Sequence, residues 1–199
     1  MKIIGLCGGS GSGKGAVSKI FLEYCIPSID TDALYHDITS KKSACVDELV
    51  SVFGDDILDS NGGVNRRILS QIVFAKKSAD KLNILNQISH RHILNKTREI
   101  INDYDREGIG AVIVDAPLLF ESGFDSECDF TVAVVADRDL RLKRIVKRDG
   151  ITNEAAARRI DAQMPDDVLI EKCDFVIENN GDVQSLYAKV NAVVSKINL

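Results

Sequence analysis

Two kinds of hydrophobic pattern alternate along the chain. Short runs rich in Val and Ile predict buried strands, and apolar residues that return every three or four positions predict amphipathic helices. The predicted strands are 2–8, 26–30, 111–120 as far as the break at Pro117, 129–136, and 173–181 with a turn at its end. The predicted helices are 13–24, 137–149, 153–163 and 182–197. This alternation predicts βαβ units and a parallel sheet covered on both faces.

The region from 33 to about 108 departs from this alternation. Its pattern is mostly helical and is interrupted by the turn "DSNGG" at 59–63. Because a segment of this size is too large for a simple crossover, we expect a helical cap beside the sheet. The pattern as a whole predicts a single α/β domain with three layers, α/β/α, around a mostly parallel sheet. Ligands bind such sheets beyond the carboxyl ends of the strands.

Composition narrows the class of protein. The chain has 199 residues, 45% hydrophobic and 28% charged, as is typical of a globular protein with a sizeable core. Its formal net charge of −5 argues against general nucleic-acid binding. With no membrane-length apolar run and no signal peptide, we expect a cytoplasmic protein without an obligate protein partner. Five scattered cysteines predict free thiols rather than disulfides or a zinc site: Cys7, Cys25, Cys45, Cys128 and Cys173.

The stretch "GGSGSGKGAV" at 8–17 has the spacing of a phosphate-binding loop, Gly8-x-x-x-x-Gly13-Lys14. Glycines let the backbone curl until successive N–H groups point at phosphate oxygens, and the next helix adds its positive N-terminus. Lys14 supplies a point charge for the β- and γ-phosphates. A flexible Gly/Ser turn is the alternative, but the flanking strand and helix favour a nucleoside triphosphate site.

The residue after Lys14 departs from the usual loop. A Ser or Thr hydroxyl normally contacts Mg²⁺ there, whereas this chain has Gly15 followed by Ala16. Mg²⁺ keeps several waters and needs few protein ligands, so ATP phosphates, water and a nearby carboxylate can hold it. Phosphate binding is therefore expected, and how the metal is held stays open.

Three carboxylates follow predicted strands. Asp30 and Asp32 are placed at the end of the second strand, where residues two apart share a face. Asp32 in particular could orient an acceptor hydroxyl or take its proton, and the alternative makes it the N-cap of the next helix. Asp115 ends an apolar strand, the place of a Walker-B-type carboxylate, with a capping role as the alternative. Asp32 and Asp115 are the candidate protein ligands of Mg²⁺.

Nine segments match one family pattern in order and in register. They are "IGLCGGSGSGKGAVS" (4–18), "IDTDAL" (29–34), "FGDDIL" (53–58), "VNRRIL" (64–69), "LNQISH" (85–90), "VDAPLLFESG" (114–123), "RLKRIVKRDG" (141–150), "ARRIDAQM" (157–164) and "CDFVIENNG" (173–181). Together they resemble the dephospho-coenzyme A kinase family. The resemblance implies a P-loop fold of the nucleoside-monophosphate-kinase type, with a helical acceptor cap at about 33–108 and a small lid at about 139–170.

On the ATP side, the resemblance implies a phosphate cradle, lid arginines and an adenine loop. The cradle would be Gly11, Ser12, Gly13, Lys14, Gly15 and Ala16. Arg144 and Arg148 fall on the lid helix, where family arginines approach the transferring phosphate. The residues that match the loop beside the adenine are Asn179, Asn180 and Gly181.

On the acceptor side, the resemblance makes Asp32 the catalytic carboxylate, beside Lys14 and the two lid arginines as catalytic residues. The substrate-binding residues that it implies are Asp32, Arg66, His90, Arg159 and Gln163. Asn65 departs from the family, which often has Asp there. His90 could instead cap or decorate a helix.

The basic helix can also be interpreted without a site. Arg138, Arg141, Arg144 and Arg148 could form a solvated face. The spacing of the last three puts them on one stripe, which favours a role opposite phosphates.

The expected reaction transfers the γ-phosphoryl group of ATP to the ribose 3′-hydroxyl of dephospho-coenzyme A, with Mg²⁺ bridging two phosphates. The closing lid would exclude water, which would otherwise be the acceptor. One alternative is a kinase of the same fold that acts on a nucleoside or nucleotide. The other is an ATP-binding regulator that lost catalysis through Gly15 and Ala16.

Overall fold

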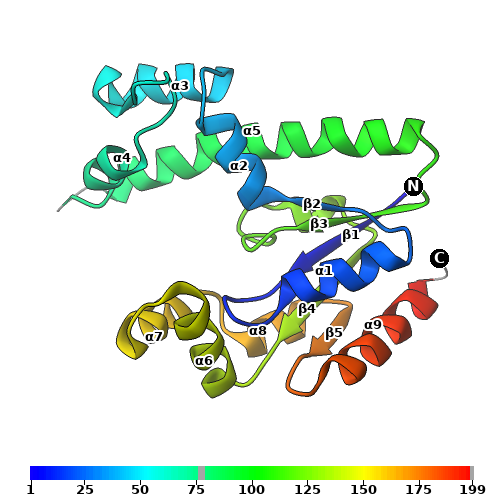
Figure 1. Cartoon of the computed structure of the whole chain (residues 1–199). Coiled ribbons are helices and arrows are strands. Elements are labelled where there is room, and N and C mark those ends of the chain that lie inside the picture. The colour runs from blue at the N-terminus through cyan, green and yellow to red at the C-terminus, as the bar shows by residue number, and fades with distance from the viewer. Residues whose placement is uncertain (76–78, 198–199) are drawn as a thin grey trace. The chain divides into compact units, whose positions relative to one another are not determined.

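The computed structural model describes residues 1–75 and 79–197, which form two compact units (Figure 1). The sheet unit contains Met1–Ile29 and Asp103–Leu199, and the helical unit contains Asp30–Asn102. The segment 33–108, predicted as a helical cap, overlaps the helical unit. Each unit has a hydrophobic core of its own.

The sheet unit is built on five strands in the order β2-β3-β1-β4-β5. Their bounds are β1 Lys2–Cys7, β2 Ser28–Asp30, β3 Ala111–Asp115, β4 Phe130–Val135 and β5 Phe175–Glu178. β1 pairs in parallel with β3 and β4, and β4 pairs in parallel with β5. The parallel sheet predicted from the alternating pattern is confirmed. Its register pairs Leu6 with Asp115 and Cys7 with Ala133, so the carboxyl ends of β1 and β3 lie at the same edge.

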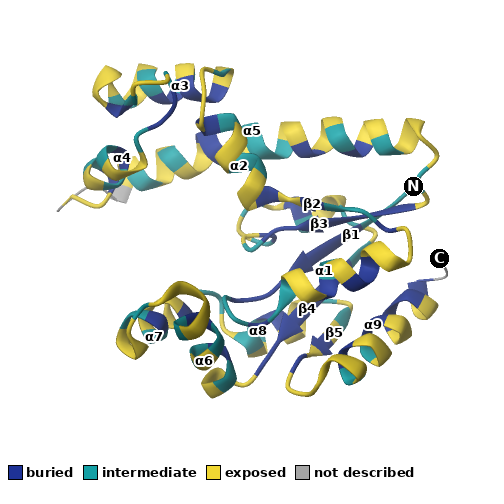
Figure 2. Ribbon diagram, in the orientation of Figure 1, coloured by how far each residue is buried: buried dark blue, intermediate teal, exposed yellow. Residues whose placement is uncertain are grey.

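Both faces of this sheet are covered, as Figure 2 shows by the burial of its strands. Helices α1 (Lys14–Glu23) and α9 (Val183–Ile197) share a core with the face that carries Ile4 and Leu6. Gly5 points to the opposite face, where an added Cβ would lie 2.8 Å from Leu119 and 2.9 Å from Cys128. The segment around the 3-10 helix Phe124–Glu127, together with α8 (Asp166–Lys172), covers that face.

Three helices make up the rest of the sheet unit between β4 and β5. They are α6 (Arg138–Asp149), α7 (Asn153–Asp161) and α8. α6 and α7 pack together around Ile145, Ala156 and Ile160. The sequence pattern did not predict α8, because its apolar residues are consecutive, Val168, Leu169 and Ile170, and follow no helical period.

The helical unit contains α2 (Thr31–Thr39), α3 (Ala44–Phe53), the 3-10 helix Asp55–Ile57, α4 (Arg66–Val73) and most of α5 (Ala79–Arg106). Its core includes Val46, Leu49, Ile57, Leu69 and Ile88. The turn predicted at 59–63 forms, with the Asp59 carboxylate accepting hydrogen bonds from the N–H groups of Asn61 and Gly63. Asn65 is the N-cap of α4, a position where Asn serves as well as Asp.

Two further observations bear on the class of protein. Across the described ranges, no helix has both the length and the apolar character of a membrane span. All five cysteines are free thiols, and the Cys7 and Cys173 sulfur atoms lie 3.5 Å apart.

Candidate active site

The loop between β1 and α1 needs glycine where backbone or a buried side chain comes close. An added Cβ at Gly8 would lie 2.3 Å from the Val134 carbonyl oxygen, and one at Gly13 would lie 2.1 Å from Asn179 Nδ2. Gly13 is also the N-cap of α1 at a φ of 100°, in the left-handed region that glycine accepts easily. The loop thus places the N-terminus of α1, with Lys14 as its first residue, at the carboxyl edge of the sheet.

Lys14 meets Asp115 at this edge. The Lys14 ammonium lies 2.8 Å from Asp115 Oδ1, and both side chains are largely buried. The Ser18 hydroxyl lies 3.4 Å from the other carboxylate oxygen of Asp115. Asp115 is the last residue of β3, whose residues are all buried, so this charged pair lies at the end of a buried strand. The end of β3 is the place expected of a Walker-B-type carboxylate.

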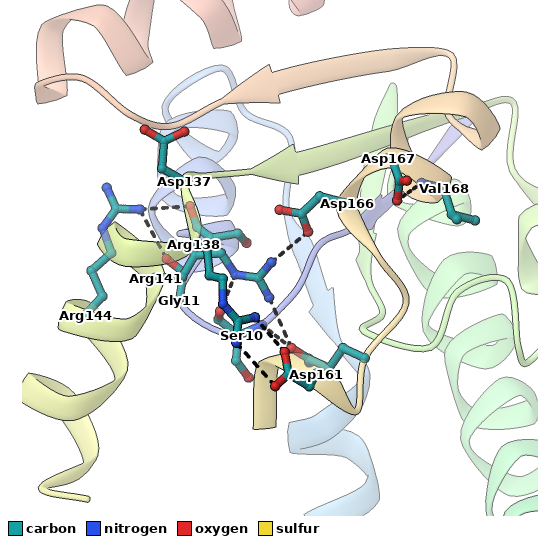
Figure 3. A network of polar contacts seen from close by, with 12 residues as sticks. Ser10, Gly11, Asp137, Arg138, Arg141, Arg144, Asp161, Asp166, Asp167 and Val168 are labelled. Atoms are coloured by element: carbon teal, nitrogen blue, oxygen red, sulfur yellow. Dashed lines mark hydrogen bonds and ion pairs between the residues drawn. The ribbon is translucent and has the colours of Figure 1, made fainter. Parts of the chain in front are cut away.

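Two arginines of α6 bind the outside of the loop (Figure 3). Arg141 Nε donates to the Ser10 carbonyl at 2.9 Å. Arg144 Nη1 lies 3.1 Å from the Gly11 carbonyl and 3.3 Å from that of Ser12. The interpretation of these two arginines as a solvated helix face is therefore wrong.

A different environment surrounds the next turn of α6 and the end of α7. Arg148 and Arg159 both bind the carboxylate of Asp149, at 2.7 Å and 2.5 Å, and both are exposed. The hydrogen bond from Arg148, with the bond from Arg159, lowers the pKa of Asp149 to about 2. The predicted stripe of three arginines therefore divides, because Arg148 contacts its neighbour and not the loop.

Gln163 also reaches the loop, although the resemblance implies a substrate-binding role for it. Its Oε1 accepts a hydrogen bond from the Ser10 N–H at 2.8 Å. The contact takes up the backbone N–H just before the predicted phosphate cradle. In this conformation Gln163 is therefore a residue that holds the loop.

The segment after β5 closes the far side of the loop. Asn179 is buried, and its Nδ2 donates to the Ser12 carbonyl at 2.8 Å, while its own carbonyl accepts from Arg144 at 3.0 Å. Asn180 exchanges hydrogen bonds with Asp137, at 2.8 Å and 2.9 Å. A cavity of about 560 Å³ beside Asn180 is lined by Asp137, Arg138, Asp139, Leu140, Lys143 and Asn180. Asn180 links this cavity to the loop, because the preceding Asn179 bonds to the Ser12 carbonyl, and the cavity suits the base of a nucleotide.

The carboxylates after β2 are arranged differently from the prediction. β2 ends at Asp30, and the Asp30 carboxylate accepts from the N–H groups of Asp32 and Ala33 as the N-cap of α2. The expectation that Asp30 and Asp32 share a face of one strand is wrong, because Asp32 lies in the first turn of α2. The capping alternative for Asp32 is wrong for the same reason, since Asp30 is the cap.

Of the predicted acceptor residues in the helical unit, Arg66 contacts two side chains of α2. Arg66 Nη2 lies 2.7 Å from His36 Nδ1, and its guanidinium lies 5.7 Å from the centre of the Tyr35 ring. Burial raises the pKa of the Tyr35 hydroxyl. His90 is half-buried on α5. The sequence reasoning did not single out Tyr35 or His36; their spacing from Asp32 on one helix was the available signal.

The comparisons with known proteins identify the family. The family model described as Dephospho-CoA kinase matches residues 2–185. The chain is 42% identical over 188 residues to the Dephospho-CoA kinase of Fusobacterium nucleatum, with 94% of each chain covered. It is 37% identical over 198 residues to that of Arabidopsis thaliana, with 99% of this chain and 84% of the relative covered.

The chain belongs to the dephospho-CoA kinase family.

Solved structures agree with this assignment. A Thermus thermophilus protein superposes with a TM-score of 0.81 at 28% identity, covering 98% of this chain and 97% of that one. The Dephospho-CoA kinase of Campylobacter jejuni gives 0.71 at 28% identity, covering 99% and 98%. A shikimate kinase from Bacteroides thetaiotaomicron, at 16% identity and a TM-score of 0.59, shares the fold. The predicted three-layer P-loop fold is confirmed.

The sheet unit brings many of the predicted ATP-side residues together. Lys14, Arg144 and Asn179 bond to the loop or to its partner carboxylate, and so does Gln163, which was predicted on the acceptor side. Arg148 and Arg159 are not among them. The sequence reasoning missed Ser10 and Asp166 altogether, and it placed Arg141 only in a stripe.

Proposed function

We propose that this chain transfers the γ-phosphoryl group of ATP to the ribose 3′-hydroxyl of dephospho-coenzyme A and releases coenzyme A and ADP. The observation that carries the proposal is the contact of Lys14 with Asp115 at the N-terminus of α1, within a family match that spans most of the chain. A kinase uses a nucleoside triphosphate, and this loop supplies the parts that hold one.

On the donor side, the phosphate cradle is residues 11–16. A triphosphate entering the loop offers Lys14 a more strongly charged partner than Asp115. Lys14 would then leave Asp115 for the β- and γ-phosphates and stabilise the charge that develops as the γ-phosphoryl leaves. The cavity beside Asn180 would take the adenine, with Gly181 following in the same loop.

The residues near Lys14 fit a hydrated Mg²⁺. Asp115 is a buried carboxylate, Ser18 places a hydroxyl 3.4 Å from it, and an added Cβ at Gly15 would meet nothing within 4 Å. Oxygen donors with room for water are what Mg²⁺ prefers. Asp115, directly or through water, would hold the ion beside the ATP phosphates, with Asp32 as a second candidate. When bound, Mg²⁺ would neutralise charge on the phosphates.

On the acceptor side, Asp32 would orient the 3′-hydroxyl and take its proton. Its position is supported by the motif "IDTDAL" and by Asp30, whose cap fixes the first turn of α2 that carries Asp32. Arg66 and His90 in the helical unit, with Arg159 and Gln163 of the lid, are the proposed substrate-binding residues. The exposed Arg148 would turn from Asp149 to the transferring phosphate when the lid closes and excludes water.

The direct test is to incubate the protein with ATP, Mg²⁺ and dephospho-coenzyme A and to read the product by mass spectrometry. We expect coenzyme A with its new phosphate on the ribose 3′-oxygen. Parallel reactions with nucleosides and nucleoside monophosphates test the other kinase hypothesis. Turnover on those compounds alone would show that one of them, and not dephospho-coenzyme A, is the acceptor. ATP binding without turnover on any acceptor would favour the regulator.

The role of Asp32 has a test of its own. Asp32→Asn keeps the size of the side chain but removes the charge and the proton acceptor. Loss of a general base lowers turnover by about 10²–10⁴-fold. Since Asp30 is the cap, the melting temperature should hold. Asp30→Ala is the matched control and should lower the melting temperature, because it removes the N-cap. Wild-type turnover in Asp32→Asn would remove Asp32 from the chemistry.

A further inference from the structure

Arg141 is the one arginine that is buried among the residues described by the structure, with 4% of its surface exposed. Its guanidinium donates to the Ser10 carbonyl at 2.9 Å and to Asp166 at 2.7 Å (Figure 3). It also donates to Gln163, at 3.4 Å. A buried charge requires such partners. The fork of donors on a guanidinium, unlike a lysine ammonium, can serve all three at once.

Both backbone groups of Ser10 are held from the lid side. Its carbonyl accepts from Arg141, and its N–H donates to Gln163, which itself contacts Arg141. Two consecutive peptide planes, on either side of Ser10, are thereby fixed. The neighbouring carbonyls of Gly11 and Ser12 are bound by Arg144, so that three successive carbonyls all turn toward cationic donors.

Two glycines of the loop make room for Arg141. An added Cβ at Gly9 would lie 2.1 Å from Arg141 Nη2. An added Cβ at Gly11 would lie 2.7 Å from the backbone oxygen of Arg141. These positions therefore need glycine because α6 comes close to them, and not only because phosphate does.

The orientation of the Ser10–Gly11 peptide decides what the loop offers to an anion. In a trans peptide the carbonyl of one residue points opposite to the N–H of the next, and the described chain has no cis bond. With the Ser10 carbonyl held by Arg141, the Gly11 N–H points away from Arg141. Gly11, at a φ of 80°, is a residue that tolerates both orientations of such a peptide. A flipped peptide would aim an electronegative carbonyl where a donor should be.

We propose that Arg141 is a positioning residue that locks the Ser10–Gly11 peptide of the phosphate loop and thereby sets the affinity for the ATP triphosphate. Asp166 neutralises the buried guanidinium, and Gln163 secures the second peptide. The inference rests on the proposed function, because it takes the loop to be the ATP phosphate site. It adds a residue that does not touch substrate and acts through the backbone.

The test measures ATP binding by calorimetric titration without acceptor, beside steady-state kinetics with ATP, Mg²⁺ and dephospho-coenzyme A. Arg141→Lys keeps the charge and can still pair with Asp166, but it loses the fork. We expect the Kd for ATP to rise by roughly 10–10²-fold, the scale of a misplacement near 1 Å. The KM for dephospho-coenzyme A should stay within about twofold of the wild-type value, because the substitution acts on the ATP loop and not on acceptor binding.

The matched control is Arg158→Lys, at an exposed arginine of α7. It should leave both constants unchanged. A merely structural role for Arg141 predicts a lower melting temperature with ATP affinity intact in the folded fraction. Wild-type ATP affinity in folded Arg141→Lys therefore overturns the proposal.

Gln163→Leu covers the case in which Arg141→Lys does not fold. It removes the acceptor for the Ser10 N–H and leaves the ion pair of Arg141 with Asp166. We expect weaker ATP binding, and unchanged affinity overturns the proposal. Failure of the proposed function is distinct, since the wild type would then make no coenzyme A whatever the variants do.

Discussion

Helices α6 and α7 carry two pairs of arginines in contrasting environments. The inner arginines, Arg141 and Arg144, bind backbone carbonyls of the phosphate loop, and Arg141 is buried. The outer arginines, Arg148 and Arg159, share the carboxylate of Asp149 at the surface. Hydrogen bonds from the inner arginines hold these loop carbonyls in one orientation, whereas an exposed ion pair contributes little to stability and exchanges easily. The comparison indicates that the inner pair shapes the site and that the outer pair is available to a ligand.

The largest expected effect sets the scale for this comparison. Lys14→Ala removes the charge that should stabilise the leaving γ-phosphoryl, so turnover should fall by roughly 10²–10³-fold, as for other transition-state donors. The measurement is kcat with saturating ATP. A folded Lys14→Ala protein with wild-type turnover would remove Lys14 from the mechanism.

Arg144→Ala tests the inner pair. It leaves the carbonyls of Gly11, Ser12 and Asn179 without their shared donor, and an unsatisfied buried group costs about 1–3 kcal/mol. We therefore expect a lower free energy of unfolding together with a weaker Kd for ATP. Denaturant titration and calorimetry check the two effects. If stability is unchanged, the inner pair is not structural.

Arg148→Ala tests the outer pair and should show the opposite profile. Its partner in this conformation is the adjacent Asp149 at the surface, so the protein should melt like the wild type. Turnover should still fall, by about tenfold or more, because the arginine is needed once the phosphate is transferring. Wild-type activity in the single alanine variants at 148 and 159 would show that both arginines are surface residues without a role in turnover.

Two glycines of the loop, Gly11 and Gly15, differ in a similar way, in how closely other atoms approach them. Gly11 faces Arg141 closely at a positive φ, whereas an added Cβ at Gly15 meets nothing within 4 Å, and the φ of Gly15 is not positive. Gly15→Ser should therefore fold normally and restore the usual hydroxyl. If the missing hydroxyl ligand weakens the metal site, Gly15→Ser should reach half-maximal turnover at a lower Mg²⁺ concentration than the wild type. An unmoved titration would show that the other donors already compensate.

The smallest expected effect is the pH dependence of the outer pair. The pKa of Asp149 is lowered to about 2 in the folded protein from an unfolded value near 3.8. A lowered pKa stabilises the fold above the unfolded value, and that contribution is lost as pH falls toward 2. The difference in melting temperature between wild type and Asp149→Asn should thus be constant above about pH 5 and shrink below pH 4. A difference that grows on acidification would contradict the ion pairs.

Much of the fold follows from local patterns. The strand, glycine loop and helix from Lys2 to Glu23 have strong signals, because a buried strand and an amphipathic helix differ in period. α8 was missed because its three apolar residues are consecutive. The prediction placed Asp32 at the end of β2, whereas it lies in α2. The error arose because Asp30 could equally end a strand or cap a helix. A capping aspartate shows no difference from a strand-end aspartate in a single sequence.

The site could be predicted only in part, because its contacts are long-range. The spacing of Arg141, Arg144 and Arg148 shows that they share a helix face, but not that Ser10, more than a hundred residues earlier, lies against the first of them. Gln163 and Asp166 lack any local signal for the same reason. Only the folded sheet brings their segment against the loop.

The most direct test of the inner and outer division is an ATP affinity measurement on Arg144→Ala and Arg148→Ala, side by side with the wild type. A non-hydrolysable ATP analogue with Mg²⁺, titrated in a calorimeter without acceptor, removes chemistry from the readout. We predict that Arg144→Ala weakens binding by tenfold or more, on the order of one lost charge-assisted contact, while Arg148→Ala binds like the wild type. Equal weakening by the two variants would contradict the division, because both arginines would then serve the bound nucleotide in the same way.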